Sequence, residues 1–213
     1  MDGVTLASRN AHKARELEEL LPDWRIQPLD ADDYPEEIGT TYYENARIKA
    51  RFAHERVGGW VIGEDSGIEV ASLGGRPGIH SARYAREAAN VVGQAADTRP
   101  EDRVASGDPG GAPAIAKLLA ELDGVDDRRA RYVSELVAIA PDGRELRGTG
   151  ILEGTIAEAP RGSGGFGYDP VFVAEGERLT VGQLGDSWKL EHSHRARAAR
   201  ALREALERGL DRA

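Results

Sequence analysis

Two adjacent carboxylates, Glu64 and Asp65, follow the apolar run Trp60–Ile62, with Gly63 between. This run predicts a buried strand that leads into a turn, because Gly63 and Gly67 bracket the acids and glycine permits tight backbone bends. Carboxylates at the end of a sheet strand are suited to holding a divalent metal ion or to taking a proton from water. An acidic surface turn would contain the same pair, so the chemistry depends on other polar motifs that converge here.

The first such motif follows a predicted strand, Val4–Ala7, and precedes a predicted helix, Ala11–Leu21, with Leu17, Leu20 and Leu21 on its apolar face. A strand, a short polar turn and a helix start together present free backbone N–H groups to an anion. Lys13, in the first turn, would add a mobile positive charge against a bound phosphate. Asn10 acts equally well as a simple helix cap, and both interpretations stay open.

A second motif comes from the acidic loop 30–39, after a predicted strand at 24–29, and from the helix behind the loop. Thr41 and Glu44 form a capping box that predicts a helix running to about Val57. Asn45 and Lys49 share one face of that helix and offer a pair of donors to an anion. A solvated helix face is the alternative for this pair.

The most specific stretch is the glycine-rich run 162–170. It satisfies the dinucleotide pattern G-x-G-x-x-G, but a predicted strand follows it where that fold requires a helix, which excludes the match. Phe166 and Tyr168 flank Gly167 and stand beside Asp169, so an aromatic face is available to stack on a nucleobase. Packing of Phe166 into the core is the alternative.

The last motif opens an amphipathic helix whose apolar face carries Leu202, Leu206 and Leu210. Ser193 is a suitable N-cap, which puts His194 and Arg195 in the first turn. Positive charge there opposes the helix dipole, and a local rule broken in this way often marks a functional site. His192 and His194 lack the i,i+4 spacing of a zinc pair, so no histidine metal site is expected.

The remainder of the chain is less informative for chemistry. The segment 86–111 is expected to be a variable surface excursion within a single domain spanning residues 1–213. Other expected elements are a structured glycine-proline loop at 73–84 whose Arg83 is placed to reach phosphate, a helix at 112–122, and strands at 131–140 and 145–152 joined by the turn Pro141-Asp142-Gly143.

Composition narrows the class of protein. The net charge of -9 argues against nonspecific nucleic-acid binding, and the chain has no cysteine for thiolate or disulfide chemistry. No apolar run approaches membrane-spanning length and no leader is evident, so a cytoplasmic protein with no membrane contact is expected. Only four of the 28 basic residues are lysines, and three of these, Lys13, Lys49 and Lys189, lie inside the motifs.

Taken in order, the motifs resemble those of the non-canonical purine nucleoside triphosphate pyrophosphatases, the inosine triphosphatase or XTP/dITP diphosphatase family. The resemblance spans nearly the whole chain and rests on residues 8–13, 44–46, 64–67, 73–84, 164–170 and 193–195. It implies an α/β fold with an elongated mixed sheet flanked by helices and two lobes around a central cleft, usually in a homodimer. It also implies Mg²⁺-dependent hydrolysis of ITP, dITP and XTP to the monophosphate and pyrophosphate.

The resemblance also implies residue roles. Asp65 matches the general base and a metal ligand, with Glu64 beside it and either Glu37 or Glu36 as the second metal carboxylate. Positions that match groups holding phosphates, sugar or base are Ser8, Asn10, Lys13, Lys49, Ser66, Phe166, Gly167, Tyr168, Asp169, Lys189, His194 and Arg195.

The chain departs from the family pattern at a few positions. In the phosphate loop, Arg9 stands where the family usually has glycine, and Ala11-His12 stands where it usually has another residue followed by glycine. In the acidic pair, Glu64 stands where Asp is more common. None of these changes removes a group with an assigned chemical role.

Two other functions stay open at this level: a related hydrolase acting on modified pyrimidine nucleotides, and a catalytically silent nucleotide-binding protein.

Overall fold

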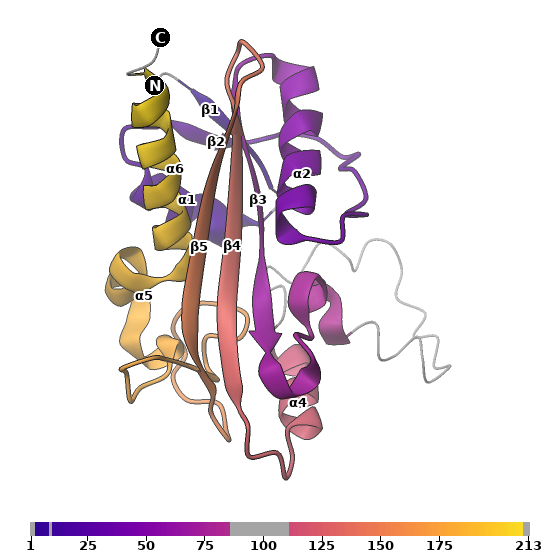
Figure 1. The fold of residues 1–213 in the computed structure, drawn as a ribbon, viewed down its shortest axis with the longest axis vertical. Coiled ribbons are helices and arrows are strands. Elements are labelled where there is room, and N and C mark those ends of the chain that lie inside the picture. Colours follow the sequence, from indigo (N-terminus) through magenta and orange to yellow (C-terminus); the bar gives the residue numbers. More distant parts are fainter. Residues whose placement is uncertain (1–2, 9, 86–110, 211–213) are drawn as a thin grey trace. The chain divides into compact units, whose positions relative to one another are not determined.

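The computed structural model describes residues 3–8, 10–85 and 111–210, and the predicted excursion at 86–111 lies almost wholly outside these ranges. The strands form a sheet of order β2-β1-β3-β4-β5-β6 (Figure 1). β1 pairs in parallel with β2 and β3, whereas β5 and β6 are antiparallel, so the expected mixed α/β fold is confirmed. The strand bounds are β1 Val4–Ala7, β2 Ile26–Pro28, β3 Trp60–Val70, β4 Arg129–Ile139, β5 Glu145–Ile156 and β6 Phe172–Ala174.

Most of the helices agree with the sequence patterns. The bounds are α1 Ala11–Leu20, α2 Tyr42–Val57, α4 Ala112–Glu121, α5 Val181–His192 and α6 His194–Leu210, with 3₁₀ helices η1 at Ala71–Leu73 and η2 at Gly78–Arg83 inside the predicted structured loop. The capping box of Thr41 and Glu44 opens α2 as predicted. Helix α5 was not predicted, because Gly185 interrupts it with a positive φ of 81° and leaves no continuous helical period. No helix in the described ranges has the length and apolar character needed to cross a bilayer.

The chain divides into two compact units. Unit 1 contains residues 1–66, 132–152 and 190–213, and unit 2 contains residues 67–131 and 153–189. The four boundaries fall inside β3, β4, β5 and α5.

One expectation about the central stretch is wrong. The sequence predicted a turn at Gly63–Gly67, but β3 continues unbroken through Glu64 and Asp65 as far as Val70. Gly63 serves packing, since a Cβ added there would collide with the carbonyl oxygen of Ala46 on α2. The glycine therefore allows the helix to approach the strand closely, and an extended strand carries both acids.

The hydrophobic core of unit 1 has two halves, one on each face of the sheet. Helices α1 and α6 cover one face and α2 covers the other (Figure 1). Successive strand residues alternate between the halves: Ile62 packs with α1 and α6, whereas Val61 packs with α2. The same alternation continues along β3 and decides which face each acid occupies.

The hairpin between β4 and β5 brings α6 into place. Its predicted turn is confirmed, with the Gly143 amide donating to the Ala140 carbonyl oxygen at 2.9 Å. β5 runs four residues beyond its predicted end at Leu152. A Cβ at Gly150 would collide with the His194 carbonyl oxygen, so glycine lets the first turn of α6 lie directly on β5.

Candidate active site

The site in unit 1 lies where β1 ends and β3 continues. The β1–β3 register ends with Ala7 opposite Gly63, so Glu64 and Asp65 extend past the neighbouring strand. Beyond Ala7 the chain turns through Ser8 into α1. Ligands in open α/β sheets commonly bind at such carboxyl ends of strands, beside the start of the following helix.

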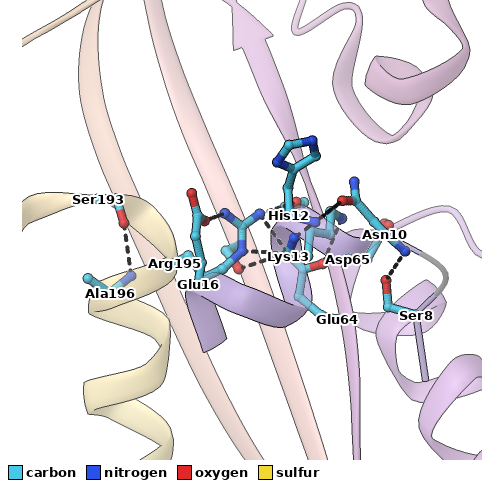
Figure 2. Close-up of polar contacts among 12 residues, drawn as sticks. Ser8, Asn10, His12, Lys13, Glu16, Glu64, Asp65, Ser193, Arg195 and Ala196 are labelled. Carbon is cyan, nitrogen blue, oxygen red and sulfur yellow. Dashed lines mark hydrogen bonds and ion pairs between the residues drawn. The ribbon is translucent and has the colours of Figure 1, made fainter. Parts of the chain in front are cut away.

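The turn into α1 is organised by Asn10. Its Oδ1 accepts hydrogen bonds from the amides of His12 at 2.9 Å and Lys13 at 3.2 Å, so the capping interpretation is confirmed. Ser8 Oγ accepts a bond from the Asn10 amide at 3.1 Å (Figure 2). The cap fixes the orientation of the side-chain amide, and its Nδ2 is buried with no hydrogen-bond partner among the described residues. This turn therefore retains a donor that a phosphate oxygen can use.

Glu64 lies on the sheet face covered by α1 and α6 and is almost completely buried. Its Oε2 lies 2.6 Å from Lys13 Nζ, and its Oε1 accepts from Arg195 Nη2 at 3.0 Å (Figure 2). Burial raises the pKa of Glu64, but Lys13 and Arg195 oppose this and hold the pKa well below its ordinary value. Glu64 is therefore ionised throughout the physiological range.

Arg195 ties α6 to this carboxylate. It also pairs with Glu16 of α1 and donates to Ser66 Oγ at 3.2 Å. Burial lowers the pKa of Arg195, yet Glu64 and Glu16 outweigh burial and raise it. Ser193 caps the helix as predicted, its Oγ accepting from the Ala196 amide at 3.1 Å. The carboxylates of Glu64 and Glu16 balance the positive charge of Arg195, which by itself opposes the helix dipole.

Asp65 lies on the opposite face, toward α2. Lys49 Nζ donates to its Oδ1 at 3.0 Å and Asn45 Nδ2 to its Oδ2 at 3.4 Å. Lys49 also pairs with Glu37 Oε1 at 2.8 Å, and it is 7% exposed, so the solvated-face alternative is wrong. Burial raises the pKa of Asp65 above its ordinary value, although Lys49 and Lys13 act to lower it. Burial lowers the pKa of Lys49, but Asp65 and Glu37 raise it overall.

The carboxylates on this face fit a magnesium ion that is completed by its substrate. No group of three or more His, Cys, Asp or Glu side chains within the described ranges is placed to hold a metal ion unaided. Mg²⁺ is usually held by one or two carboxylates together with substrate phosphates. Asp65 and Glu37 bond to the same ammonium group, which brings two suitable oxygens together, whereas the neighbouring Glu36 is exposed.

Unit 2 holds the aromatic and glycine-rich motif. Asp169 Oδ2 accepts from the Phe166 amide and from Lys189 Nζ, both at 2.9 Å. Lys189 Nζ also lies 4.6 Å from the centre of the Phe166 ring. Phe166 is only partly buried, so its predicted alternative as a core residue is wrong. Tyr168 takes the core position instead and donates to the Ser81 carbonyl oxygen at 3.0 Å.

The glycine-rich loop is anchored to the start of α5. Thr180 Oγ1 donates to the Arg161 carbonyl oxygen at 2.6 Å, and the Gly182 amide donates to the Asp169 carbonyl oxygen at 2.8 Å. Gly165 and Gly167 have φ values of 72° and 64°, and a Cβ at Gly165 would collide with the Asp169 carboxylate. Glycine at these positions allows the loop to fold around Asp169.

Two site residues, Glu16 and Tyr132, were missed from the sequence. Glu16 stands three residues after Lys13, and this helical spacing places the two side chains on one face of α1. Tyr132 of β4 stacks on the His194 ring, with centroids 4.5 Å apart and the planes 12° from parallel. Nothing in the local sequence signals this stack, because the two residues meet only through tertiary packing.

Comparisons with known proteins place the chain in a family. A family model described as the Ham1 family matches residues 4–205. A dITP/XTP pyrophosphatase of Symbiobacterium thermophilum is 43% identical, over 96% of this chain and 93% of that protein. One from Nitratidesulfovibrio vulgaris is 40% identical, over 94% of each. The Staphylococcus aureus Ham1 protein structure has a TM-score of 0.76 at 33% identity, covering 97% of this chain and 99% of that one. The HAM1 protein structure from Coxiella burnetii gives 0.74 at 32% identity, covering both chains fully.

Proposed function

The chain belongs to the Ham1 family, and on this premise we propose that it hydrolyses the non-canonical purine nucleoside triphosphates ITP, dITP and XTP to the monophosphate and pyrophosphate. The observation that carries the proposal is the arrangement of Asp65 in unit 1. This buried carboxylate has a raised pKa and stands beside Lys49, near the end of β1. It combines a proton acceptor with the positive charge that a triphosphate requires.

The phosphates are proposed to bind to the positive groups and amides of unit 1. Asn10 Nδ2 is a donor without a hydrogen-bond partner within the described part of the chain. Lys13 and Lys49 are each paired with carboxylates, which keeps both ammonium groups ordered. Incoming phosphate oxygens would share these lysines, and Ser8 would hold the turn in shape.

Mg²⁺ is the proposed cofactor. Asp65 and Glu37 would hold it, since Glu37 is already in contact with Lys49, and Glu36 is the alternative loop glutamate. When bound, the ion would neutralise charge on the phosphates and on the departing pyrophosphate.

In the proposed reaction, Asp65 accepts a proton from a water molecule whose oxygen attacks phosphorus. The bond between the α- and β-phosphates breaks, and pyrophosphate leaves with the bonding electron pair. A raised pKa makes Asp65 a stronger base than an ordinary aspartate. Lys49 holds that carboxylate in place through its bond to Oδ1.

The base is proposed to be recognised by the polar and aromatic groups of unit 2. His194 and Arg195 of α6 are proposed to hold the nucleotide within unit 1. Phe166 offers a partly exposed ring, and Lys189 with Asp169 forms a buried ion pair beside it. Gly167 and Tyr168 shape the loop, and Ser66 contacts Arg195. Donors directed at a 6-oxo group would be left unpaired by a 6-amino group, a mismatch that can change the discrimination between substrates by about 10⁴-fold.

A homodimer and a cytoplasmic location, both expected from the sequence, remain part of the proposal.

The decisive test is pyrophosphate release from ITP, dITP, XTP, ATP and GTP with Mg²⁺, beside an Asp65→Asn variant. Release from ITP, dITP and XTP, with ATP and GTP rejected and activity lost in the variant, is the expected result. Because GTP shares the 6-oxo group, its rejection tests the 2-position separately. Binding of ITP without any release would show a nucleotide-binding protein in place of an enzyme.

A further inference from the structure

Glu64 and Asp65 are adjacent in sequence but contact different groups of helices. Alternation along β3 directs Glu64 toward Lys13 of α1 and Arg195 of α6. Asp65 is directed toward Asn45 and Lys49 of α2. Because the two carboxylates face opposite sides of the sheet, they are unsuited to acting as a pair on one ion.

We propose that Glu64 is a positioning residue, which acts on the reaction by holding Lys13 and Arg195 in place and does not bind the metal ion. This inference rests on the proposed function and gives Glu64 a role different from the metal ligand suggested by the sequence.

Both oxygens of Glu64 are already engaged. Oε2 forms an ion pair with Lys13 Nζ at 2.6 Å, and Oε1 accepts hydrogen bonds from Nε and Nη2 of Arg195 at 3.3 Å and 3.0 Å (Figure 2). Ser134 Oγ approaches Oε1 at 3.5 Å, and the residue is 1% exposed. A metal ion would have to displace one of these cations and enter a buried position.

The positioning role follows from the residues that Glu64 joins. A lysine side chain has a flexible four-carbon stem, and holding its ammonium group in one place reduces the ordering needed when phosphate binds. Arg195 stands in the first turn of α6, next to His194. One carboxylate on β3 therefore fixes the phosphate-binding lysine on α1 and the start of α6.

The kinetic test is a double-mutant cycle on XTP hydrolysis with Glu64→Gln and Lys13→Met. If Glu64 acts through Lys13, Glu64→Gln alone lowers kcat/KM about tenfold or more, mainly through KM, and adds less than about threefold once Lys13 is Met. Glu64→Asp keeps the charge and recovers most of the loss. Independent, multiplicative effects of the two changes would overturn the inference.

Glu135→Gln is the matched control for neutralising a buried acid. Glu135 of β4 is 4% exposed and pairs with Arg147 at 2.7 Å, away from Lys13. Its effect on kcat/KM should be unaffected by Lys13→Met. Circular dichroism and thermal unfolding of each variant establish that it is folded before its kinetics are compared.

Binding of Mn²⁺ to the nucleotide-free protein, followed by electron paramagnetic resonance, separates the two roles directly. Glu64→Gln should bind Mn²⁺ like the unaltered protein, whereas Asp65→Asn should bind it more weakly. Equal weakening in the two variants would show that Glu64 is a metal ligand. Failure of the unaltered protein to hydrolyse XTP would instead refute the proposed function.

Discussion

At the residue scale, two neighbouring buried carboxylates have pKa values shifted in opposite directions. Burial raises the pKa of both, but Glu64 is compensated by two close cations, Lys13 and Arg195, which reverse the shift. Asp65 has one close cation, Lys49, which it shares with Glu37, so burial prevails. The strand geometry therefore separates a permanently charged anchor from a carboxylate suited to accepting a proton.

Asp65→Asn should stabilise the protein at neutral pH while abolishing hydrolysis. Because the folded-state pKa of Asp65 lies above 3.8, its favourable contribution is full below pH 3.8 and is lost as pH rises through the folded pKa. The Tm difference between the variant and the unaltered protein should therefore increase from pH 4 toward neutrality. Thermal unfolding across this range measures it.

Asp127→Asn is the control for that measurement. The side chain of Arg129 donates hydrogen bonds that lower the pKa of Asp127 to about 2, so the ionised form favours folding above the unfolded-state pKa. Removing this charge should not raise Tm at neutral pH. A Tm for Asp65→Asn that is equal to or below that of the unaltered protein at pH 7 would contradict the expected sign.

At the element scale, close packing of α2 on β3 determines the surroundings of Asp65. Gly63 allows the contact, and α2 then supplies both Asn45 and Lys49 one and two turns along its length. Both side chains are buried and both bond to Asp65. A small shift of the helix would therefore disturb the base even though its own strand is unchanged.

Gly63→Ala should destabilise the protein by about 1–3 kcal/mol, because the added methyl group collides with the backbone of α2. Urea unfolding measures the loss, and kcat should fall with it. The matched control is Gly59→Ala, since a Cβ there meets no atom within 4 Å. Equal free energies of unfolding for the two variants would show that α2 is not held close by Gly63.

At the scale of the whole molecule, each compact unit contains a different kind of recognition group. Unit 1 has Lys13, Lys49 and Asp65, which are suited to phosphates and to proton transfer. Unit 2 has Phe166 and the Lys189–Asp169 pair, which are suited to a base. The two groups of residues should therefore respond differently to a ligand that lacks a base.

Inorganic tripolyphosphate is such a ligand and tests this division. Phe166→Ala should raise the KM for XTP roughly 5- to 150-fold, because base–aromatic stacking is worth about 1–3 kcal/mol. Inhibition by tripolyphosphate should be unchanged in that variant and weakened by Lys13→Met. A parallel loss of tripolyphosphate inhibition in Phe166→Ala would contradict the division.

The sequence by itself determined the elements whose signals are local. Asn10, Ser193 and the Thr41–Glu44 box mark helix starts through caps that act within a few residues, and Pro141-Asp142-Gly143 marks a hairpin turn. The ordered motifs also indicated the family. These features depend on near neighbours in the chain, so they can be recognised without knowing the fold.

Only the tertiary structure decided which residues meet. The segment at Gly63, predicted to be a turn, is part of a strand. The glycine is required by close packing against Ala46 and Ala50 of α2, which lie 17 and 13 residues earlier in the chain. Likewise, Glu16 joins Arg195 across 179 positions, and Glu64 joins it across 131. Such pairs depend on strand register and helix packing over long sequence separations, which no local pattern encodes. The separate roles of Glu64 and Asp65 are therefore a consequence of the folded sheet.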